Sequence, residues 1–230
     1  MKIYHGSKSI IEKPIFGMGN PHNDYGLGFY CTADIELAKE WACTDNTVNG
    51  YANIYEAAID EYAAGKSAYK ILDLRKPPYT ILNWIAVLLK FRTFDVNNPI
   101  AVEAKAYLSE NFYTEVENYD IVVGYRADDS YFSFARDFLN NTISLQQLGE
   151  AMELGELGTQ IVLKSEKAFD TVEFAGYEIA ESKEYYVKRA SRDKKAREQY
   201  FNVNRNAVVR NGIFVIDLMR NGVKNGDDIL

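Results

Sequence analysis

The sequence predicts a single α+β domain with a helical insertion. Short runs of aromatic and β-branched residues lie near both ends of the chain, and segments with helical spacing of apolar residues lie between them. No regular alternation of strand and helix is present. The 230 residues, 47% of them hydrophobic, are enough to bury one substantial core. We therefore expect residues 1–230 to form one domain, with the insertion at about 77–118.

The chain opens with two predicted strands and a helix. Residues 2–5 (KIYH) and 28–32 (GFYCT) have the composition of strands. The segment between them is crowded with Gly, Pro, Asn and Asp, which predicts a long loop, and loops of this length are usually functional. The stretch TADIELAKEWACT then predicts an amphipathic helix, capped by Asp34 or Thr32.

The middle and end of the chain continue the mixed order. Residues 52–60 and 70–74 predict strands, and apolar residues recur at helical spacing from Pro77 to Tyr119. The continuous apolar run at 120–126 is typical of a buried strand. Helices are expected at 130–141, 144–155 and 181–200. Strands are expected at 159–165 and 171–174.

Charge is distributed unevenly. The net charge of −7 argues against broad affinity for nucleic acid. Residues 183–210, however, carry nine Lys or Arg against three acidic residues, a local charge of +6. Two interpretations stay open: a solvated helix face beside acidic neighbours, or a docking surface for an acidic partner or nucleic acid. Binding of the second kind is expected to weaken as salt rises.

The cysteines and the N-terminal sequence limit which classes of protein are compatible with the chain. Cys31 and Cys43 fall in apolar stretches and form no CxxC pattern, which predicts reduced core thiols. Two histidines and two cysteines at these spacings do not make a zinc site, so no metal is predicted. The chain shows no secretory signal and no run of about 20 apolar residues, which predicts a cytoplasmic protein that does not enter a membrane.

Chemistry-bearing residues gather in the first 41 positions. His5 ends a strand, where its ring can bond a ligand hydroxyl, and it is followed by Gly6, which leaves the backbone open to a flat ligand, and by Ser7. Trp41 lies eleven residues after Tyr30, so two rings are available to bracket a heterocycle. Taken one by one, these residues are more often structural: a histidine on a strand is usually a satisfied structural residue, and Tyr30 and Trp41 are more often part of the core.

The segments YHGS and YGLGFYCTADIELAKEWA resemble the first two motifs of the ADP-ribosyltransferase superfamily, in its diphtheria-toxin and poly(ADP-ribose) polymerase branch. The resemblance implies two small sheets split around a cleft that binds NAD as cosubstrate. It implies that His5 contacts the adenosine-side ribose, that the Gly6 backbone pairs with the carboxamide, and that Tyr30 and Trp41 sandwich the nicotinamide. The implied NAD-binding residues are His5, Gly6, Ser7, Gly28, Phe29, Tyr30 and Trp41.

The third motif of that superfamily is a glutamate that steadies the positive charge formed as nicotinamide leaves. The best match, GTQIVLKS, places Gln160 at that position. Glu156 and Glu166 are alternative carboxylates, and alternation along the strand predicts Glu166 on the same face as Gln160. Ala38 stands where polymerase-branch members have a serine. The implied catalytic residues are His5, Tyr30 and Gln160.

A further polar segment follows the strand at 120–126. Arg126, Asp128, Asp129 and Tyr131 have the character of residues that line a cleft. Capping of the next helix by Asp129 or Ser130 explains the same segment equally well.

The resemblance implies an NAD-dependent mono-ADP-ribosyltransferase that acts on an intracellular macromolecule, either protein or nucleic acid. Transfer of a single unit is expected because the family glutamate is missing. Analogy further implies the toxin of a bacterial toxin–antitoxin or phage-defence pair, with an antitoxin protein as partner. Two alternatives remain: a catalytically inactive relative that binds a nucleotide or a protein, favoured by Gln160, and an interaction module in which the aromatic residues are core.

Overall fold

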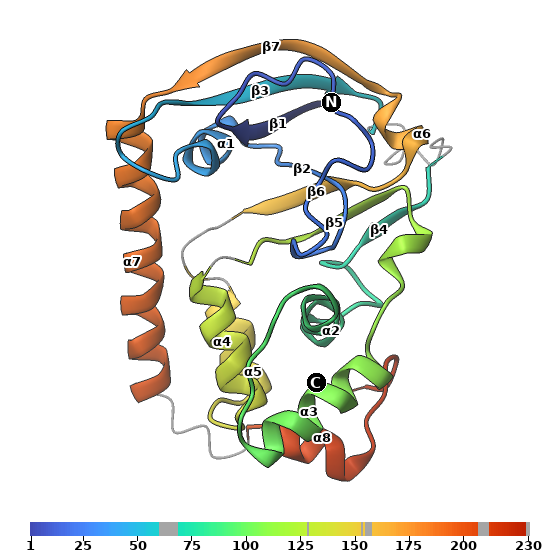
Figure 1. Cartoon of the computed structure of the whole chain (residues 1–230). Helices are drawn as coiled ribbons and strands as arrows, with labels where there is room; N and C mark the ends of the chain where they lie inside the picture. Colours follow the sequence, from blue (N-terminus) through green and yellow to red (C-terminus); the bar gives the residue numbers. More distant parts are fainter. Residues whose placement is uncertain (60–68, 128, 153, 155–157, 207–211, 229–230) are drawn as a thin grey trace. The chain divides into compact units, whose positions relative to one another are not determined.

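The computed structural model confirms the α+β class and contains two sheets (Figure 1). It describes residues 1–59, 69–127, 129–152, 154, 158–206 and 212–228. The chain divides into two compact units, and the division falls within helix α7 (Ser182–Asn206). The first unit takes the described residues of 1–73, 115–126 and 157–192, and the second takes those of 74–114, 127–156 and 193–230.

The first unit contains both sheets. Sheet A is antiparallel, in the order β1 (Lys2–Ser7), β3 (Gly50–Ala57), β7 (Val172–Ala180). Sheet B has the order β2 (Phe29–Cys31), β6 (Thr159–Leu163), β5 (Ile121–Tyr125), β4 (Ile71–Asp73), and only its β4–β5 pair is parallel. The short 3₁₀ helix η2 (Val116–Asn118) precedes β5.

The core of the first unit lies where the two sheets face each other. Ile3 and Tyr55 of sheet A and Cys31, Ile161 and Leu163 of sheet B are buried in one cluster. Because successive side chains of a strand alternate between faces, the neighbouring residues of sheet B point to its other face. Both cysteines are free and buried, as predicted.

Helix α1 (Ile35–Ala42) packs closely on sheet A. Asp34 caps it, accepting hydrogen bonds from the backbone N–H groups of Glu36 at 2.8 Å and Leu37 at 3.4 Å. Gly6 permits the close approach, since a Cβ at that position would lie 2.0 Å from the carbonyl oxygen of Ala38.

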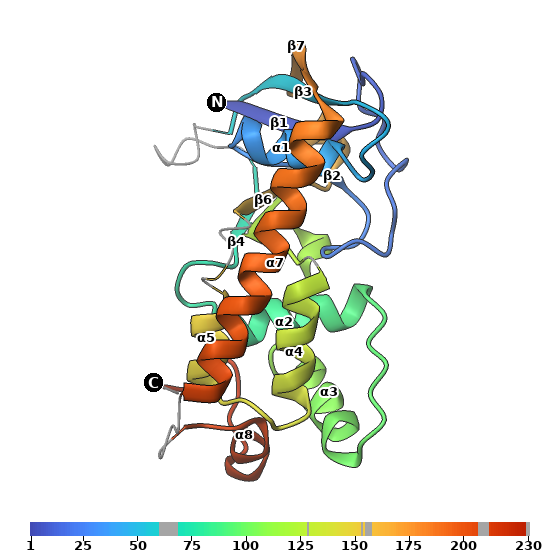
Figure 2. The ribbon, with the colours of Figure 1, turned by 90° about the vertical axis from the view of Figure 1, so that its left-hand side faces the viewer.

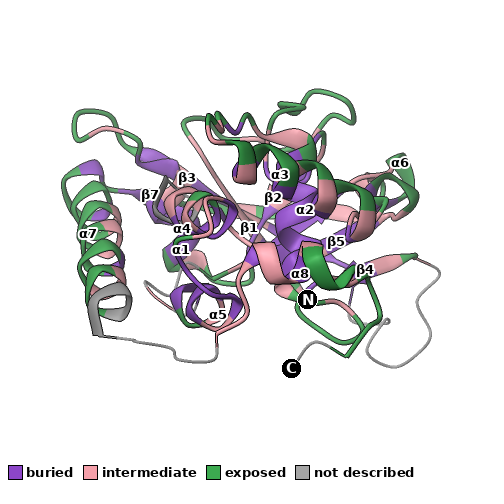
Figure 3. Ribbon diagram, turned by 90° about the horizontal axis from the view of Figure 1, so that it is seen from below, coloured by how far each residue is buried: buried purple, intermediate pink, exposed green. Residues whose placement is uncertain are grey.

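The first half of α7 neutralises acidic residues of α1. The guanidinium of Arg192 donates to both carboxylate oxygens of Glu40, at 2.9 and 2.8 Å, and the Nζ of Lys188 lies 3.3 Å from Glu36. Part of the basic stretch is therefore paired within the first unit. Figure 2 shows α7 as one long helix, and most of its described residues are exposed (Figure 3).

The second unit is helical. It contains the helices α2 (Ile81–Phe91), α3 (Pro99–Asn111), α4 (Asp129–Leu139), α5 (Leu145–Met152) and α8 (Val215–Asn221). The insertion expected at 77–118 accounts for α2 and α3. Asn83 of α2 is buried and donates to the carbonyl of Phe112 at 2.9 Å, and the Tyr107 hydroxyl of α3 donates to the carbonyl of Leu218 at 3.0 Å.

The prediction that Glu166 shares a strand face with Gln160 is wrong. Strand β6 ends at Leu163, and the Ser165 hydroxyl accepts a hydrogen bond from the Ala168 N–H at 3.2 Å, which caps the short helix α6 (Glu166–Phe169). Glu166 therefore opens a helix beyond the strand. The other alternative, Glu156, lies outside the described residues. No helix within the described ranges combines the length and the apolar character that crossing a membrane requires.

Candidate ligand-binding site

The long loop between β1 and β2 is fixed at its start by Asn53. This fully buried side chain donates through Nδ2 to the carbonyls of His5 and Ser9 and to the Ser7 hydroxyl, each at 3.2 Å. Its Oδ1 accepts the Ile11 N–H at 2.8 Å. The role of Ser7 in this structure is thus to hold the loop.

The end of the loop is fixed by Lys164 and Tyr30. The Nζ of Lys164 donates to the carbonyls of Tyr25, at 2.5 Å, and Leu27, at 3.0 Å. The Tyr30 hydroxyl donates to the Gly26 carbonyl at 2.6 Å and accepts the Tyr25 N–H at 3.0 Å. Anchored at both ends, the loop forms one wall of a cavity.

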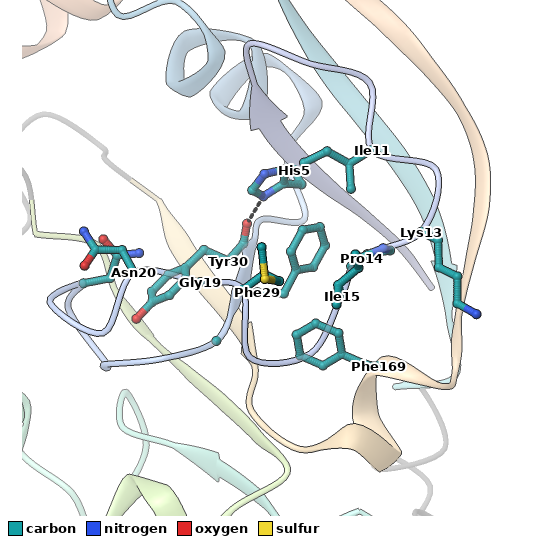
Figure 4. Close-up of a pocket in the computed structure, with 13 residues that line it drawn as sticks. His5, Ile11, Lys13, Pro14, Ile15, Gly19, Asn20, Phe29, Tyr30 and Phe169 are labelled. Atoms are coloured by element: carbon teal, nitrogen blue, oxygen red, sulfur yellow. Dashed lines mark hydrogen bonds between the residues drawn. The ribbon is translucent and has the colours of Figure 1, made fainter.

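The cavity lies between this loop and β2 and has a volume of about 370 Å³ (Figure 4). Its surface is mainly apolar, with a few polar groups, which is the composition of small-molecule sites. The residues that line it are His5, Ile11, Lys13, Pro14, Ile15, Met18, Gly19, Asn20, Asn23, Gly28, Phe29, Tyr30 and Phe169.

His5 is oriented within the cavity wall. Its ring stacks on Phe29 with centroids 4.4 Å apart, and its Nδ1 lies 2.7 Å from the Tyr30 carbonyl, as the dashed line in Figure 4 marks. Because a carbonyl only accepts, Nδ1 carries the proton, and Nε2 of the neutral ring is an acceptor. Burial lowers the pKa of His5, and the bond to the Tyr30 carbonyl offsets part of that effect. The ring is therefore suited to accept a hydrogen bond from a ligand hydroxyl.

Gly6 presents backbone groups at a strand edge. The backbone bonds between Tyr4 and Thr32, at 2.8 and 2.9 Å, place the N–H and C=O of Tyr4 on the edge of β1 that faces away from β3. Successive residues alternate in this respect, so the N–H and C=O of Gly6 point to the same outer edge. The face of β1 at Gly6 packs on α1, where a Cβ at this position would meet Ala38.

Trp41 and Gln160 carry buried polar atoms without a partner. Trp41 is half-buried on α1, and its Nε1–H has no hydrogen-bond acceptor among the described residues. Gln160 begins the buried part of β6, is 7% exposed, and its Oε1 likewise lacks a donor there. A buried polar group left unpaired costs stability, so such groups in a native structure need an explanation, and a missing ligand is one.

Arg126 contacts Trp41 and follows the strand that pairs with Gln160. Its guanidinium carbon lies 4.7 Å from the centroid of the Trp41 ring. Arg126 also follows Gly124 by two residues, and Gly124 is paired with Gln160 across β5 and β6. We call Gly6, Trp41, Arg126 and Gln160 the edge cluster.

The residues predicted from the sequence divide between these two places. His5, Gly28, Phe29 and Tyr30 line the cavity, whereas Gly6, Trp41 and Gln160 belong to the edge cluster. Tyr30 joins the two: it pairs with Val162, two residues from Gln160, so the side chains of Tyr30 and Gln160 lie on the same face of sheet B.

The polar segment after β5 is only partly visible. Arg126 is described, Asp128 lies outside the described residues, and Asp129 and Tyr131 fall in the first turn of α4, where the side chains are not described.

Three residues that shape the site escaped the sequence analysis: Asn53, Lys164 and Phe169. Only Asn53 carries a signal, as a polar residue in a strand that is otherwise largely apolar. No cluster of three or more His, Cys, Asp or Glu suited to a metal ion occurs among the residues described.

Comparison with known protein families gives a match over most of the chain. A family model described as "Protein of unknown function (DUF3990)" matches residues 1–174, which include every residue of the cavity and the edge cluster. No curated protein and no solved structure matched the chain.

Proposed function

The chain belongs to the DUF3990 family, and we propose that it is an NAD-dependent mono-ADP-ribosyltransferase. The observation that carries the proposal is a pair of buried atoms, the Trp41 Nε1–H and the Gln160 Oε1, that have no hydrogen-bond partner among the described residues. A donor on a flat aromatic ring and an acceptor at the start of β6 suit a ligand with a planar heterocycle attached to a hydroxyl-bearing sugar. The nicotinamide riboside half of NAD has this composition.

Four residues of the site have a direct role in this proposal. The nicotinamide stacks on Trp41, and its carboxamide pairs with the backbone of Gly6 at the outer edge of β1. Gln160 accepts a hydrogen bond from the ribose attached to the nicotinamide. The adenosine half extends toward the cavity, where the Nε2 of His5 accepts a ribose hydroxyl.

Gln160 limits the rate of the proposed reaction. As the glycosidic bond to nicotinamide breaks, positive charge develops on the ribose, and a carboxylate would stabilise it. A neutral amide orients the hydroxyl without supplying that charge. We therefore expect slow turnover, with transfer of one ADP-ribose unit to a macromolecular acceptor.

A second candidate follows from the same residue. Because Gln160 lacks a charge, the site is also suited to binding NAD or another nucleotide without catalysis.

We propose that the active enzyme is the toxin of a toxin–antitoxin or phage-defence pair. Its partner would be an antitoxin protein, and its acceptor a protein or a nucleic acid. Transfer of labelled ADP-ribose from NAD to components of a cell lysate tests that role and separates the enzyme from the inactive binder.

Calorimetric titration with NAD tests the proposed site. Trp41→Ala removes the stacking surface, for which an aromatic pair contributes about 1 kcal/mol, so NAD affinity should fall about fivefold or more. Trp41→Phe keeps a smaller aromatic ring and loses the N–H donor, so its affinity should lie between that of wild type and that of Trp41→Ala. Tyr186→Ala, which removes an exposed aromatic ring of α7, is the matched control and should bind as wild type does.

The melting temperature of each variant is measured alongside. Equal NAD affinity of wild type and a folded Trp41→Ala variant contradicts the placement of nicotinamide on this ring. Absence of NAD binding to the folded wild-type protein contradicts the proposed function as a whole.

A further inference from the structure

The contact between Arg126 and Trp41 has a counterpart in the second unit. There the guanidinium carbon of Arg92 lies 4.5 Å from the ring centroid of Phe132, a similar cation–π geometry. The two contacts differ in their surroundings. The buried donor of Trp41 has no acceptor in the described part of the chain. The strand that leads to Arg126 is paired with the strand of Gln160, whose Oε1 has no donor in that part either. Arg126 thus covers a ring that belongs to a site with unused hydrogen-bonding groups.

The direction from which Arg126 reaches the ring matters. It comes from the end of β5, and its near neighbour Gly124 lies opposite Gln160. Gly158, two residues before Gln160, faces α1, because a Cβ there would lie 2.3 Å from the Cδ1 of Leu37. Leu37 is one helical turn before Trp41. The end of sheet B and the Trp41 end of α1 are therefore adjacent, and the guanidinium lies on the Trp41 ring from the sheet B side.

A flat ligand that contacts both Gln160 and the Trp41 ring needs the space that the guanidinium occupies. We propose that Arg126 is a gate on the edge cluster: it covers the Trp41 ring when the site is empty and has to leave the ring before a heterocycle can stack there. This inference rests on the proposed function, since it takes the nicotinamide of NAD as the group that stacks.

The gate selects between ligands by charge. A neutral ring such as free nicotinamide displaces the guanidinium without offering it a new partner. NAD carries a diphosphate, and an arginine displaced from an aromatic ring can pair with phosphate oxygens in a bidentate manner. Arg126 therefore disfavours free nicotinamide, the product, more strongly than NAD, the cosubstrate.

Titration calorimetry with two probes, nicotinamide and NAD, tests the gate. The variants are Arg126→Gln and Arg126→Met, two neutral replacements of which the second keeps most of the aliphatic length. Arg92→Gln removes the comparable contact in the second unit and is the matched control. The contact to be broken corresponds to about 2- to 30-fold in affinity, so nicotinamide should bind the Arg126 variants tighter by that factor. NAD should gain less, and the Arg92 variant should bind both probes as wild type does.

If Arg126 only stabilises the fold, its replacement should lower the affinity for nicotinamide. A higher affinity for nicotinamide therefore distinguishes a gate from a purely structural role. The gate is overturned if NAD binds wild type while nicotinamide binds the folded Arg126 variants no more tightly than it binds wild type. Failure of both probes to bind any of the four folded proteins, at concentrations up to the millimolar range, overturns the proposed function and the gate with it.

Discussion

Replacing Gly6 with alanine tests the packing that places α1, and with it Trp41, against β1. The added Cβ would lie 2.0 Å from the Ala38 carbonyl oxygen and 2.9 Å from the Ala42 nitrogen, both backbone atoms of α1. A normal contact requires about 3 Å or more, so helix and strand have to separate by about 1 Å. Overpacking of this kind costs about 1–3 kcal/mol, and two rigid backbones place this case at the upper end, about 3 kcal/mol. For a chain of this size, that corresponds to a fall in melting temperature of about 6–12 °C.

Thermal unfolding followed by circular dichroism measures this effect. Gly149→Ala is the control, since Gly149 lies in helix α5 and no atom of the described residues outside the backbone of its own helix lies within 4 Å of the added Cβ. Alanine is favoured over glycine inside a helix by about 0.5–1 kcal/mol, so this variant should melt about 1–4 °C higher than wild type. NAD affinity should fall in the Gly6 variant, because α1 carries Trp41 away from the edge of β1. A Gly6→Ala protein that melts at the wild-type temperature would refute the packing of α1 described above.

Two further predictions concern the cavity. The folded protein binds the His5 proton less readily than the unfolded chain, because burial lowers the pKa of His5, so wild-type stability should fall as pH drops through about 6.5. His5→Phe removes the titrating ring. Chemical denaturation from pH 7.5 to 5 should therefore show the free energy of unfolding of wild type falling relative to that of the variant. A difference in unfolding free energy that stays constant with pH contradicts a buried His5 with a lowered pKa. Asn53→Ala removes four hydrogen bonds of a buried side chain, at a cost of about 1–3 kcal/mol or more, whereas the exposed Asn46→Ala should be neutral in urea denaturation. Equal stability of the two asparagine variants would show that Asn53 does not hold the loop.

The elements predicted correctly have strong local signals. Strand β1 and helix α1 follow from an aromatic and β-branched run and from an amphipathic period capped by Asp34. Short helices escaped prediction. Helix α6 has four residues, too few to show a period, and its start depends on the Ser165 hydroxyl. The misplacement of Glu166 has this origin, because strand alternation was extended past the point where β6 ends.

The site shows a different limit of sequence reasoning. Adjacent residues of a strand point to opposite faces, and this separates His5, whose ring stacks on Phe29, from Gly6, which packs on α1. The resemblance of the YHGS motif assigned both residues to one NAD site, and it gave no information on which face each residue occupies. The contact of Arg126 with Trp41 joins residues 85 positions apart, and no local pattern encodes it. The buried atoms of Trp41 and Gln160 that lack a partner among the described residues are likewise a property of packing.

Release of nicotinamide from NAD by wild type, Gln160→Glu and Gln160→Ala tests the central claim most directly. A glutamate at this position supplies the charge that the glutamine lacks, and one such electrostatic contribution is typically worth about 10²–10³ in rate. The account predicts slow release by wild type, faster release by Gln160→Glu, up to that factor, and slower release by Gln160→Ala. Equal rates for the three folded proteins would contradict the assignment of Gln160 to the reacting ribose, and with it the proposed enzyme.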